Sequence, residues 1–177
     1  MKQKAQNKLL MKTPIGNLLF GANINEAIIT TCELPPSLPD GMAIDGSFIV
    51  LFRYSPSTNE KYLDFFCQWE NLEEEGFSAS GEALCAWEWE KKQTLVMIGT
   101  EDEDWLSQRL PIKKEENYFV EMKENCLTIK IEEIPKNTEF TLHFVVAWSS
   151  IPEKTENSCW FAVDVPHVKI LRECKKT

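Results

Sequence analysis

The sequence predicts an all-β, mainly antiparallel fold, either a β-sandwich or an open barrel of about nine to ten strands with one or two short helices. Most of the chain alternates apolar and polar residues with a period of two, which is typical of half-buried strands. Turn-rich connectors separate these runs, and no strand–helix–strand alternation indicates a parallel sheet. With 177 residues and 43% hydrophobic residues, the chain has material for one core. We therefore expect residues 1–177 to form a single globular domain.

The first half of the chain carries four expected strands. Two short ones, 17–22 and 26–33, precede the proline-rich segment 34–41. Two longer apolar runs, 47–54 and 62–69, flank the connector Ser-Pro-Ser-Thr-Asn-Glu. Because this connector is rich in turn residues, we predict that the two runs pair as a hairpin.

Two more hairpins are expected in the second half. Residues 118–122 and 126–132 flank Lys-Glu-Asn, and residues 139–149 and 159–165 flank a polar loop. In the run 139–149, the alternate residues Phe, Leu, Phe, Val and Trp form one continuous apolar face. This pattern predicts a long strand with that face in the core.

Helix is expected mainly at 101–108. Thr100 and Glu103 have the spacing of a capping box, which makes Thr100 the predicted N-cap. The segment 81–92 fits either a strand or a helix. A strand is favoured because the apolar run 94–98 follows at hairpin distance.

Both ends of the chain are basic. Residues 1–12 carry four lysines and no acid, and we expect them to form a flexible extension. Their apolar stretch is too short for a signal peptide, which favours a cytoplasmic protein. The basic C-terminal end is either a flexible extension as well or is held by strand pairing through residues 168–171.

The cysteine pattern supports the same compartment. No Cys-x-x-Cys spacing is present, so neither a zinc knuckle nor a redox pair is indicated. Disulfide-rich secreted domains are denser in cysteine than this chain. We therefore expect reduced, partly buried thiols at the six positions, which are Cys32, Cys67, Cys85, Cys126, Cys159 and Cys174.

The chain is acidic, with a formal net charge of −9. Residues 60–104 hold thirteen acidic residues against three lysines, a local charge of −10. Such a field repels phosphate backbones and anionic membrane surfaces, which argues against nucleic-acid or membrane binding. No apolar stretch approaches the roughly 18 residues of a membrane-spanning helix. The same field speeds encounter with a basic protein, although acidity also serves solubility alone.

Sequence motifs for catalysis are missing. The chain has no nucleophile elbow, phosphate-binding glycine loop or dinucleotide fingerprint. Its two histidines, His143 and His167, have no metal-ligand spacing, although a Cys–His dyad formed across the fold is an alternative. Neighbouring carboxylates are abundant and are best explained as a solvated charged surface. We predict a protein that is not an enzyme, with no catalytic residue, cofactor or metal.

The six tryptophans are the most distinctive chemistry. Four of them lie in or beside the acidic stretch, and aromatic rings among carboxylates suit an Arg or Lys from a partner. Core packing is the alternative for each ring. The predicted partner-binding residues are Trp69, Glu73, Glu74, Trp87, Glu88, Trp89, Glu90, Asp102, Asp104 and Trp105.

Two kinds of binding protein fit these features. The first is an acidic module that inhibits a basic protein. In overall character (small, acidic, poor in motifs and rich in aromatics) the chain resembles bacterial immunity proteins, which block a toxin through an acidic surface. That resemblance covers no particular stretch. The second is a β-sandwich that binds a carbohydrate or another small ligand through a tryptophan-lined face. The oligomeric state stays open.

Overall fold

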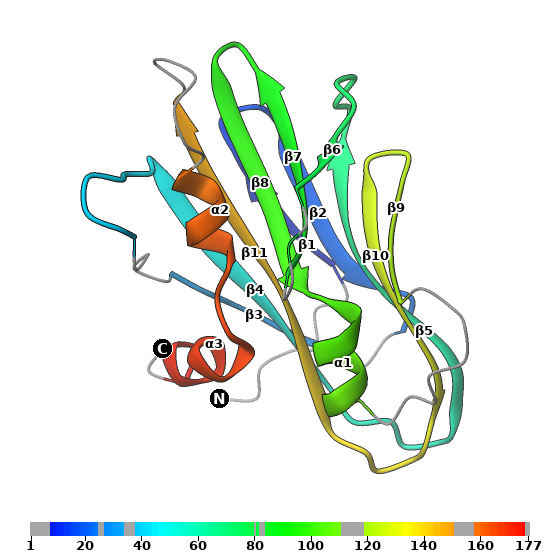
Figure 1. Cartoon of the computed structure of the whole chain (residues 1–177). Coiled ribbons are helices and arrows are strands. Elements are labelled where there is room, and N and C mark those ends of the chain that lie inside the picture. The colour runs from blue at the N-terminus through cyan, green and yellow to red at the C-terminus, as the bar shows by residue number, and fades with distance from the viewer. Residues whose placement is uncertain are drawn as a thin grey trace, which may run out of the picture.

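The computed structural model describes residues 8–24, 27–33, 38–79, 81, 84–110, 119–150 and 158–175. Within these ranges, eleven strands and three short helices form a β-sandwich of two antiparallel sheets (Figure 1). The predicted fold class is confirmed.

Sheet A has five strands in the order β1-β2-β5-β10-β9. Their bounds are β1 Lys8–Lys12, β2 Asn17–Ala22, β5 Glu60–Glu70, β9 Val120–Lys123 and β10 Cys126–Ile134. Sheet B has six strands in the order β3-β4-β11-β8-β7-β6. Their bounds are β3 Ile28–Cys32, β4 Gly46–Tyr54, β6 Phe77–Ser78, β7 Leu84–Lys91, β8 Thr94–Glu101 and β11 Phe140–Ser150.

The main core lies between the two sheets, where the strands bring alternate residues to their inner faces. Phe52 of β4 meets Phe65 of β5 edge to face, with ring centroids 5.3 Å apart. Phe144 of β11 joins Phe52 in the same way at 6.0 Å. All three rings are fully buried, and each contributes about 1.5–3 kcal/mol through removal from water.

A second apolar cluster covers the outer face of sheet B, the face turned away from sheet A. Helix α2 (Ser158–Val163) packs there on β8 and β11, and α3 (His167–Glu173) follows it (Figure 1). Gly99 of β8 permits this approach, because a Cβ at this position would lie 3.0 Å from the Cβ of Val163. The central strands of sheet B are therefore buried on both faces, which gives β4 its nearly continuous apolar sequence.

The predicted pairing of 47–54 with 62–69 is wrong, although both strands exist. β4 pairs with β3 and β11 in sheet B, and β5 pairs with β2 and β10 in sheet A. The connector between them crosses from one sheet to the other. Two hydrogen bonds hold it: the Asn137 N–H donates to the Pro56 carbonyl at 2.8 Å, and the Lys136 N–H donates to Asn59 Oδ1 at 2.9 Å.

The predicted strand at 159–165 is also wrong. This segment forms α2, whose buried residues Cys159, Ala162 and Val163 recur at helical spacing. A third hairpin with β11 therefore does not form. Residues 168–171 belong to α3 and pair with no strand.

Two hairpins are confirmed: β9 pairs with β10, and β7 pairs with β8. The segment 81–92 is thus a strand from Leu84 onward, with residues 82–83 outside the described residues. At the N-terminus, residues 8–12 are not a flexible extension but edge strand β1, paired with β2. Residues 1–7 of the expected extension lie outside the described residues.

The predicted helix at 101–108 is observed as α1 (Glu103–Arg109), but its N-cap is Asp102 instead of Thr100. The Asp102 carboxylate accepts a hydrogen bond from the backbone N–H of Trp105 at 2.8 Å. Thr100 is still part of β8, where its buried hydroxyl donates to the carbonyl of His143 at 2.7 Å. The strand therefore continues two residues further than the capping pattern suggests.

The expectation of reduced thiols is wrong for one pair. Cys32 at the end of β3 and Cys174 after α3 form a disulfide, with Cα atoms 5.5 Å apart and a sequence separation of 142. The other four cysteines, Cys67, Cys85, Cys126 and Cys159, form no disulfide. Because disulfides persist in oxidising compartments, the cysteines no longer support a cytoplasmic location. None of the three helices in the described ranges is long and apolar enough to span a membrane.

Candidate functional site

The predicted partner-binding residues do not form one surface patch. Trp69 and Trp89 lie inside the sandwich, 5% and 1% exposed, and their rings meet edge to face at 5.5 Å. The Trp89 indole N–H donates to Asn125 Oδ1 at 3.0 Å. These two rings are part of the core and are not exposed to a partner.

The four predicted residues of β7 divide between its two faces. Trp87 and Trp89 point toward the main core, and Trp87 is half-buried at its margin. Glu88 and Glu90 alternate with them and lie on the outer face of sheet B, in line with the buried residues of the second cluster. An exposed aromatic joins these acids: Phe77 of β6 pairs with Glu88 and is 68% exposed.

Glu73 and Glu74 lie in the segment that links β5 to β6. Glu73 is exposed. Glu74 accepts a 2.9 Å salt bridge from Lys91 Nζ at the end of β7. This hydrogen bond from Lys91 lowers the pKa of the half-buried Glu74 carboxyl. Glu74 therefore already has a basic partner within the chain.

The last three predicted residues lie on or next to α1. Trp105 is 51% exposed and has Asp102 before it and Asp104 beside it. Helix α1 follows Glu101, at the opposite end of the β7–β8 hairpin from Glu90. The predicted surface is thus divided into a β6–β7 group and an α1 group, one toward each end of the hairpin.

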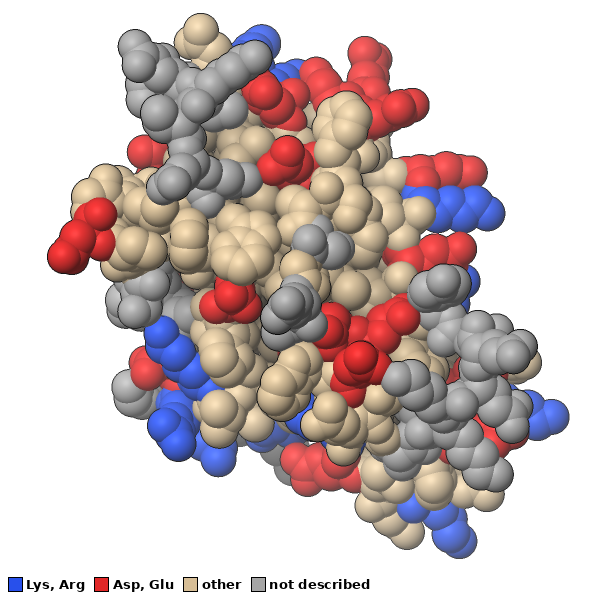
Figure 2. Space-filling model, in the orientation of Figure 1, with Lys and Arg blue, Asp and Glu red and all other residues tan. Residues whose placement is uncertain are grey.

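Figure 2 shows the molecule from the same side as Figure 1, in which β7, β8 and α1 lie toward the viewer. Acidic side chains occur through the middle and the upper right of this face, whereas Lys and Arg gather toward its margins. The face combines negative charge with exposed aromatic rings.

The six tryptophans do not gather on one exposed face. All six tryptophans lie in the described residues, and Trp105 is the one among them that is more than about a third exposed. Trp148 packs against the main core, and the indole N–H of Trp160 donates to the carbonyl of Ala79 at 3.0 Å. The rings serve different parts of the fold and do not line one surface.

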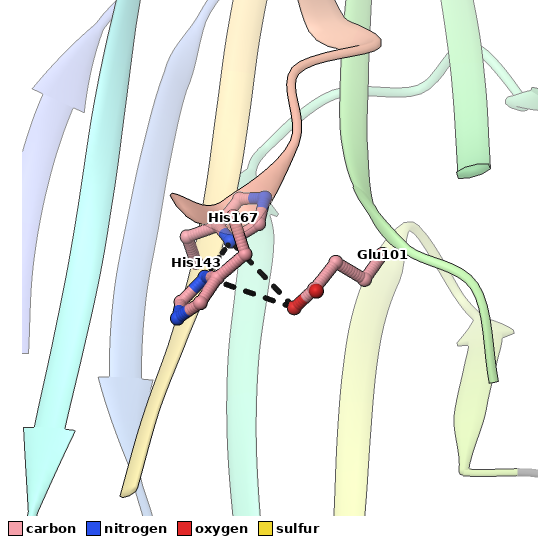
Figure 3. Close-up of side chains that lie close together, drawn as sticks. All are labelled: Glu101, His143 and His167. Atoms are coloured by element: carbon pink, nitrogen blue, oxygen red, sulfur yellow. Dashed lines mark hydrogen bonds and ion pairs between the residues drawn. The ribbon is translucent and has the colours of Figure 1, made fainter. Parts of the chain in front are cut away.

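The structure also assembles a buried polar site that the sequence did not predict. His143 of β11 and His167 at the start of α3 stack at 5.0 Å between ring centroids, with an interplanar angle of 19°. Their Nδ1 atoms are 2.8 Å apart. Glu101, at the end of β8, points its Oε2 at both rings, 3.9 Å from Nδ1 of His143 and 3.7 Å from Nδ1 of His167 (Figure 3). We call these three residues the histidine cluster.

Two further residues fix the orientation of the histidine cluster. Arg109, the last residue of α1, forms a two-pronged salt bridge to Glu101: its Nε donates to Oε1 at 3.1 Å and its Nη2 donates to Oε2. Its Nη1 also donates to the carbonyl of Thr141 at 2.8 Å. The hydroxyl of Thr141 is 2.8 Å from Nε2 of His167. The site therefore joins β8, α1, β11 and α3.

Burial keeps both imidazoles neutral. It holds the pKa of His143 well below its ordinary value, and the neighbouring His167 and Arg109 lower it further. Burial, together with Arg109, lowers the pKa of His167 to about 3. With two neutral rings, one Nδ1 donates its proton to the other across the 2.8 Å contact. Neutral imidazole nitrogens and a carboxylate are also the donors that bind transition metals.

Residues far apart in sequence build this site, which is why spacing did not reveal it. His143 and His167 are 24 residues apart, and Glu101 belongs to a different hairpin. The available signal was weak: a histidine between Thr141 and Val145 on one face of β11. A Cys–His dyad is not seen among the described residues. The hydrogen-bond partner of His143 Nδ1 is His167 Nδ1, and the partner of His167 Nε2 is the Thr141 hydroxyl.

Comparison with known proteins adds little to this description. The chain matches no protein-family model and no curated protein. Among solved structures it is similar to one titled "Putative kojibiose phosphorylase from human microbiome", with a TM-score of 0.42 and 10% sequence identity. The match covers 90% of this chain and 22% of that chain. The chain therefore spans about a fifth of that protein's length, and nothing about its activity follows from so distant a likeness.

Proposed function

We propose that this protein is a non-enzymatic interaction module that binds and inhibits a basic protein through the β6–β7 edge of sheet B and helix α1. The narrower part of the proposal is an immunity-type role, in which the basic partner is a toxin. The observation that carries the proposal is the β6–β7 group, where the exposed ring of Phe77 lies across from Glu88.

The net charge of the protein and the local arrangement of its side chains support this surface in different ways. The net charge of −9 favours encounter with a basic protein from any direction. The local arrangement then selects where the partner binds. An exposed aromatic ring supplies buried area on binding, and carboxylates beside it pair with Arg or Lys. Glu88 and Glu90 share one strand face, so a single basic segment along β7 would meet both.

The α1 group offers a second contact of the same kind. Trp105 is exposed next to Asp104, and tryptophan is common among residues that dominate binding energy. Asp102 is less suited to this role, because its carboxylate already caps the helix. We therefore assign the partner-binding role to Phe77, Glu88, Glu90, Asp104 and Trp105.

The first experiment is a pull-down from lysate of the source organism at low and moderate salt, read by mass spectrometry. It compares the natural protein with Glu88→Lys/Glu90→Lys and with a matched control, Glu70→Lys/Glu132→Lys. The control makes the same charge change on exposed positions of sheet A. Near-UV circular dichroism verifies that each variant is folded.

We expect one stoichiometric basic protein that the natural chain and the sheet A control retain and the sheet B variant loses. With that protein purified, the association rate should fall steeply as salt rises, and Trp105→Ala should weaken the affinity at least about 30-fold. If both double variants lose the basic protein equally, net charge alone explains the binding, and a specific binding surface is refuted. An association rate that does not respond to salt would refute electrostatic steering.

A further inference from the structure

We infer that the histidine cluster is a binding site for a divalent transition metal, with zinc as the expected ion. Glu101, His143 and His167 are the three protein ligands. The site is independent of the proposed interaction surface, since it lies beneath α3 and its three ligands are all less than a tenth exposed. Its role would be structural, because the metal would tie the C-terminal helix α3 to β8 and β11 of sheet B.

The three candidate ligand atoms lie close to the spacing that a tetrahedral zinc site requires, which is about 3.3–3.4 Å between ligand atoms. The Nδ1 atoms of His143 and His167 are 2.8 Å apart, and Glu101 Oε2 lies 3.9 Å and 3.7 Å from them. A point in the plane of these three atoms is equidistant from them at about 2.1 Å. Zinc binds imidazole nitrogen at about 2.0–2.1 Å and carboxylate oxygen at about 2.0–2.2 Å. A tetrahedral ion with a water molecule as its fourth ligand lies out of this plane, so the two Nδ1 atoms must move apart by about 0.5 Å as zinc enters.

The surrounding groups are those that support a metal ligand. A ligating histidine normally donates its other ring N–H to an oxygen, which fixes the ring and its tautomer. His167 has this arrangement, with Nε2 at 2.8 Å from the hydroxyl of Thr141. Arg109 donates to both oxygens of the Glu101 carboxylate, the candidate ligand atom Oε2 included. Ligating carboxylates are held by hydrogen bonds in the same way.

Zinc binding also requires no protein group to gain or lose a proton. In the metal-free cluster, one neutral histidine donates Nδ1–H to the other Nδ1. Zinc takes the place of that proton, which moves to Nε2 of the same ring. The unfavourable factor is Arg109, whose positive charge lies beside the carboxylate. It weakens the affinity relative to the same three ligands without an arginine, so a zinc titration should extend into the micromolar range.

The chain allows a clean test, because His143 and His167 are its only histidines. Metal-stripped protein with its disulfide intact is titrated with zinc by calorimetry, and the one-equivalent complex is examined by X-ray absorption. The variants are His167→Gln, Thr141→Val and, as a matched control, Cys85→Ser/Cys126→Ser. The control removes the two half-buried thiols, which are the competing zinc ligands.

We expect one zinc per chain, with two imidazoles and only nitrogen and oxygen neighbours at about 2.0–2.1 Å. His167→Gln should weaken zinc binding at least about 100-fold, and Thr141→Val about 10- to 100-fold, because Thr141 only positions a ligand. The thiol control should bind as the natural protein does. If His167→Gln fails to fold, the isosteric Thr141→Val and the absorption spectrum decide the matter.

Three results would overturn the inference. The first is no stoichiometric zinc binding by the natural protein up to millimolar zinc. The second is sulfur at about 2.3 Å in the absorption spectrum, which would move the ion to the cysteines. The third is undiminished zinc binding by folded His167→Gln. In each case, the cluster is a hydrogen-bonded network that holds α3 on sheet B without a metal.

Discussion

Asn125 connects the two sheets through a single hydrogen bond to Trp89. Its side-chain oxygen accepts the Trp89 indole N–H at 3.0 Å. Its amide nitrogen donates to the carbonyls of Leu72 and Glu74, at 3.2 Å and 2.9 Å. Asn125 is in the tight turn between β9 and β10, in sheet A, whereas Trp89 belongs to sheet B. One side chain thus satisfies a buried donor and holds the segment between β5 and β6.

Asn125→Ala should lower the free energy of unfolding by about 2–4 kcal/mol. The change removes all three side-chain hydrogen bonds and leaves the buried indole N–H of Trp89 without its partner. It also places alanine at a residue with φ of 58°. Urea unfolding followed by tryptophan fluorescence measures the effect.

Asn125→Gly separates the two causes. Glycine accepts the left-handed backbone, so this variant should be about 1 kcal/mol more stable than Asn125→Ala. If Asn125→Gly is as stable as the natural protein, the side-chain hydrogen bonds contribute nothing, which would contradict the prediction.

Gly76→Ala should destabilise the fold by about 1–3 kcal/mol through steric overlap. A Cβ at position 76 would lie 2.5 Å from the ring of Trp89. That ring is buried and held by its bond to Asn125, so it has no room to withdraw. Thermal unfolding measures the loss as a lower midpoint.

Gly16→Ala is the matched control for that overlap. A Cβ there would meet the Trp69 ring at 3.5 Å, an ordinary contact. Its effect should stay within about 0.5 kcal/mol. Equal losses at both positions would mean that backbone entropy, and not contact with Trp89, decides the cost.

Reduction of the Cys32–Cys174 disulfide should lower the free energy of unfolding by about 2–5 kcal/mol. The bond closes a loop of 142 residues, and long loops lose the most unfolded-state entropy on cross-linking. Denaturant curves with and without reductant test this, with Cys32→Ser/Cys174→Ser as the permanent equivalent.

Thiol counting verifies the bond itself. Unfolded, unreduced protein should react with four equivalents of a thiol reagent, and reduced protein with six, since four cysteines form no disulfide. Six equivalents before reduction would show that the bond is not formed.

Alkylation of Cys85 and Cys159 in the folded protein should be slow at pH 8 and should rise about tenfold per pH unit toward pH 11. Burial raises the pKa of each thiol to about 11, and nearby carboxylates add to this effect. Since only the thiolate reacts, about one molecule in a thousand is reactive at pH 8. Mass spectrometry after timed alkylation measures each site.

Unfolded protein is the reference for these rates. Without burial, both thiols return to a pKa near 8.5 and should react faster by two to three orders of magnitude at pH 8. Rapid alkylation of either site in the folded protein, at the rate of the unfolded chain, would contradict the burial argument.

The local pattern of the sequence determined the strands and the class of fold. Period-two alternation identified β10 and β11, because side chains of a strand alternate between core and solvent whatever the strand pairs with. Tight turns likewise predicted the β7–β8 and β9–β10 hairpins. The same local information misassigned α2, because a short segment with several apolar residues satisfies both strand and helix periods.

Only the tertiary structure decided sheet membership and the position of each tryptophan. The β4–β5 connector resembles a hairpin turn, yet the partners of both strands come from distant segments, and long-range pairing sends them to different sheets. Trp87 and Trp105 have similar acidic neighbours in sequence. Trp87 nevertheless packs against the main core, whereas Trp105 is exposed on helix α1.

The histidine cluster shows the same limit most clearly. Nothing near His143 in sequence distinguishes it from an outward-facing strand residue. It is buried because α3, whose first residue is His167, covers the outer face of sheet B, and because Glu101 and Arg109 converge there from β8 and α1. Periodicity records which way a side chain points, whereas the element that packs against it is chosen by contacts between residues far apart in the chain.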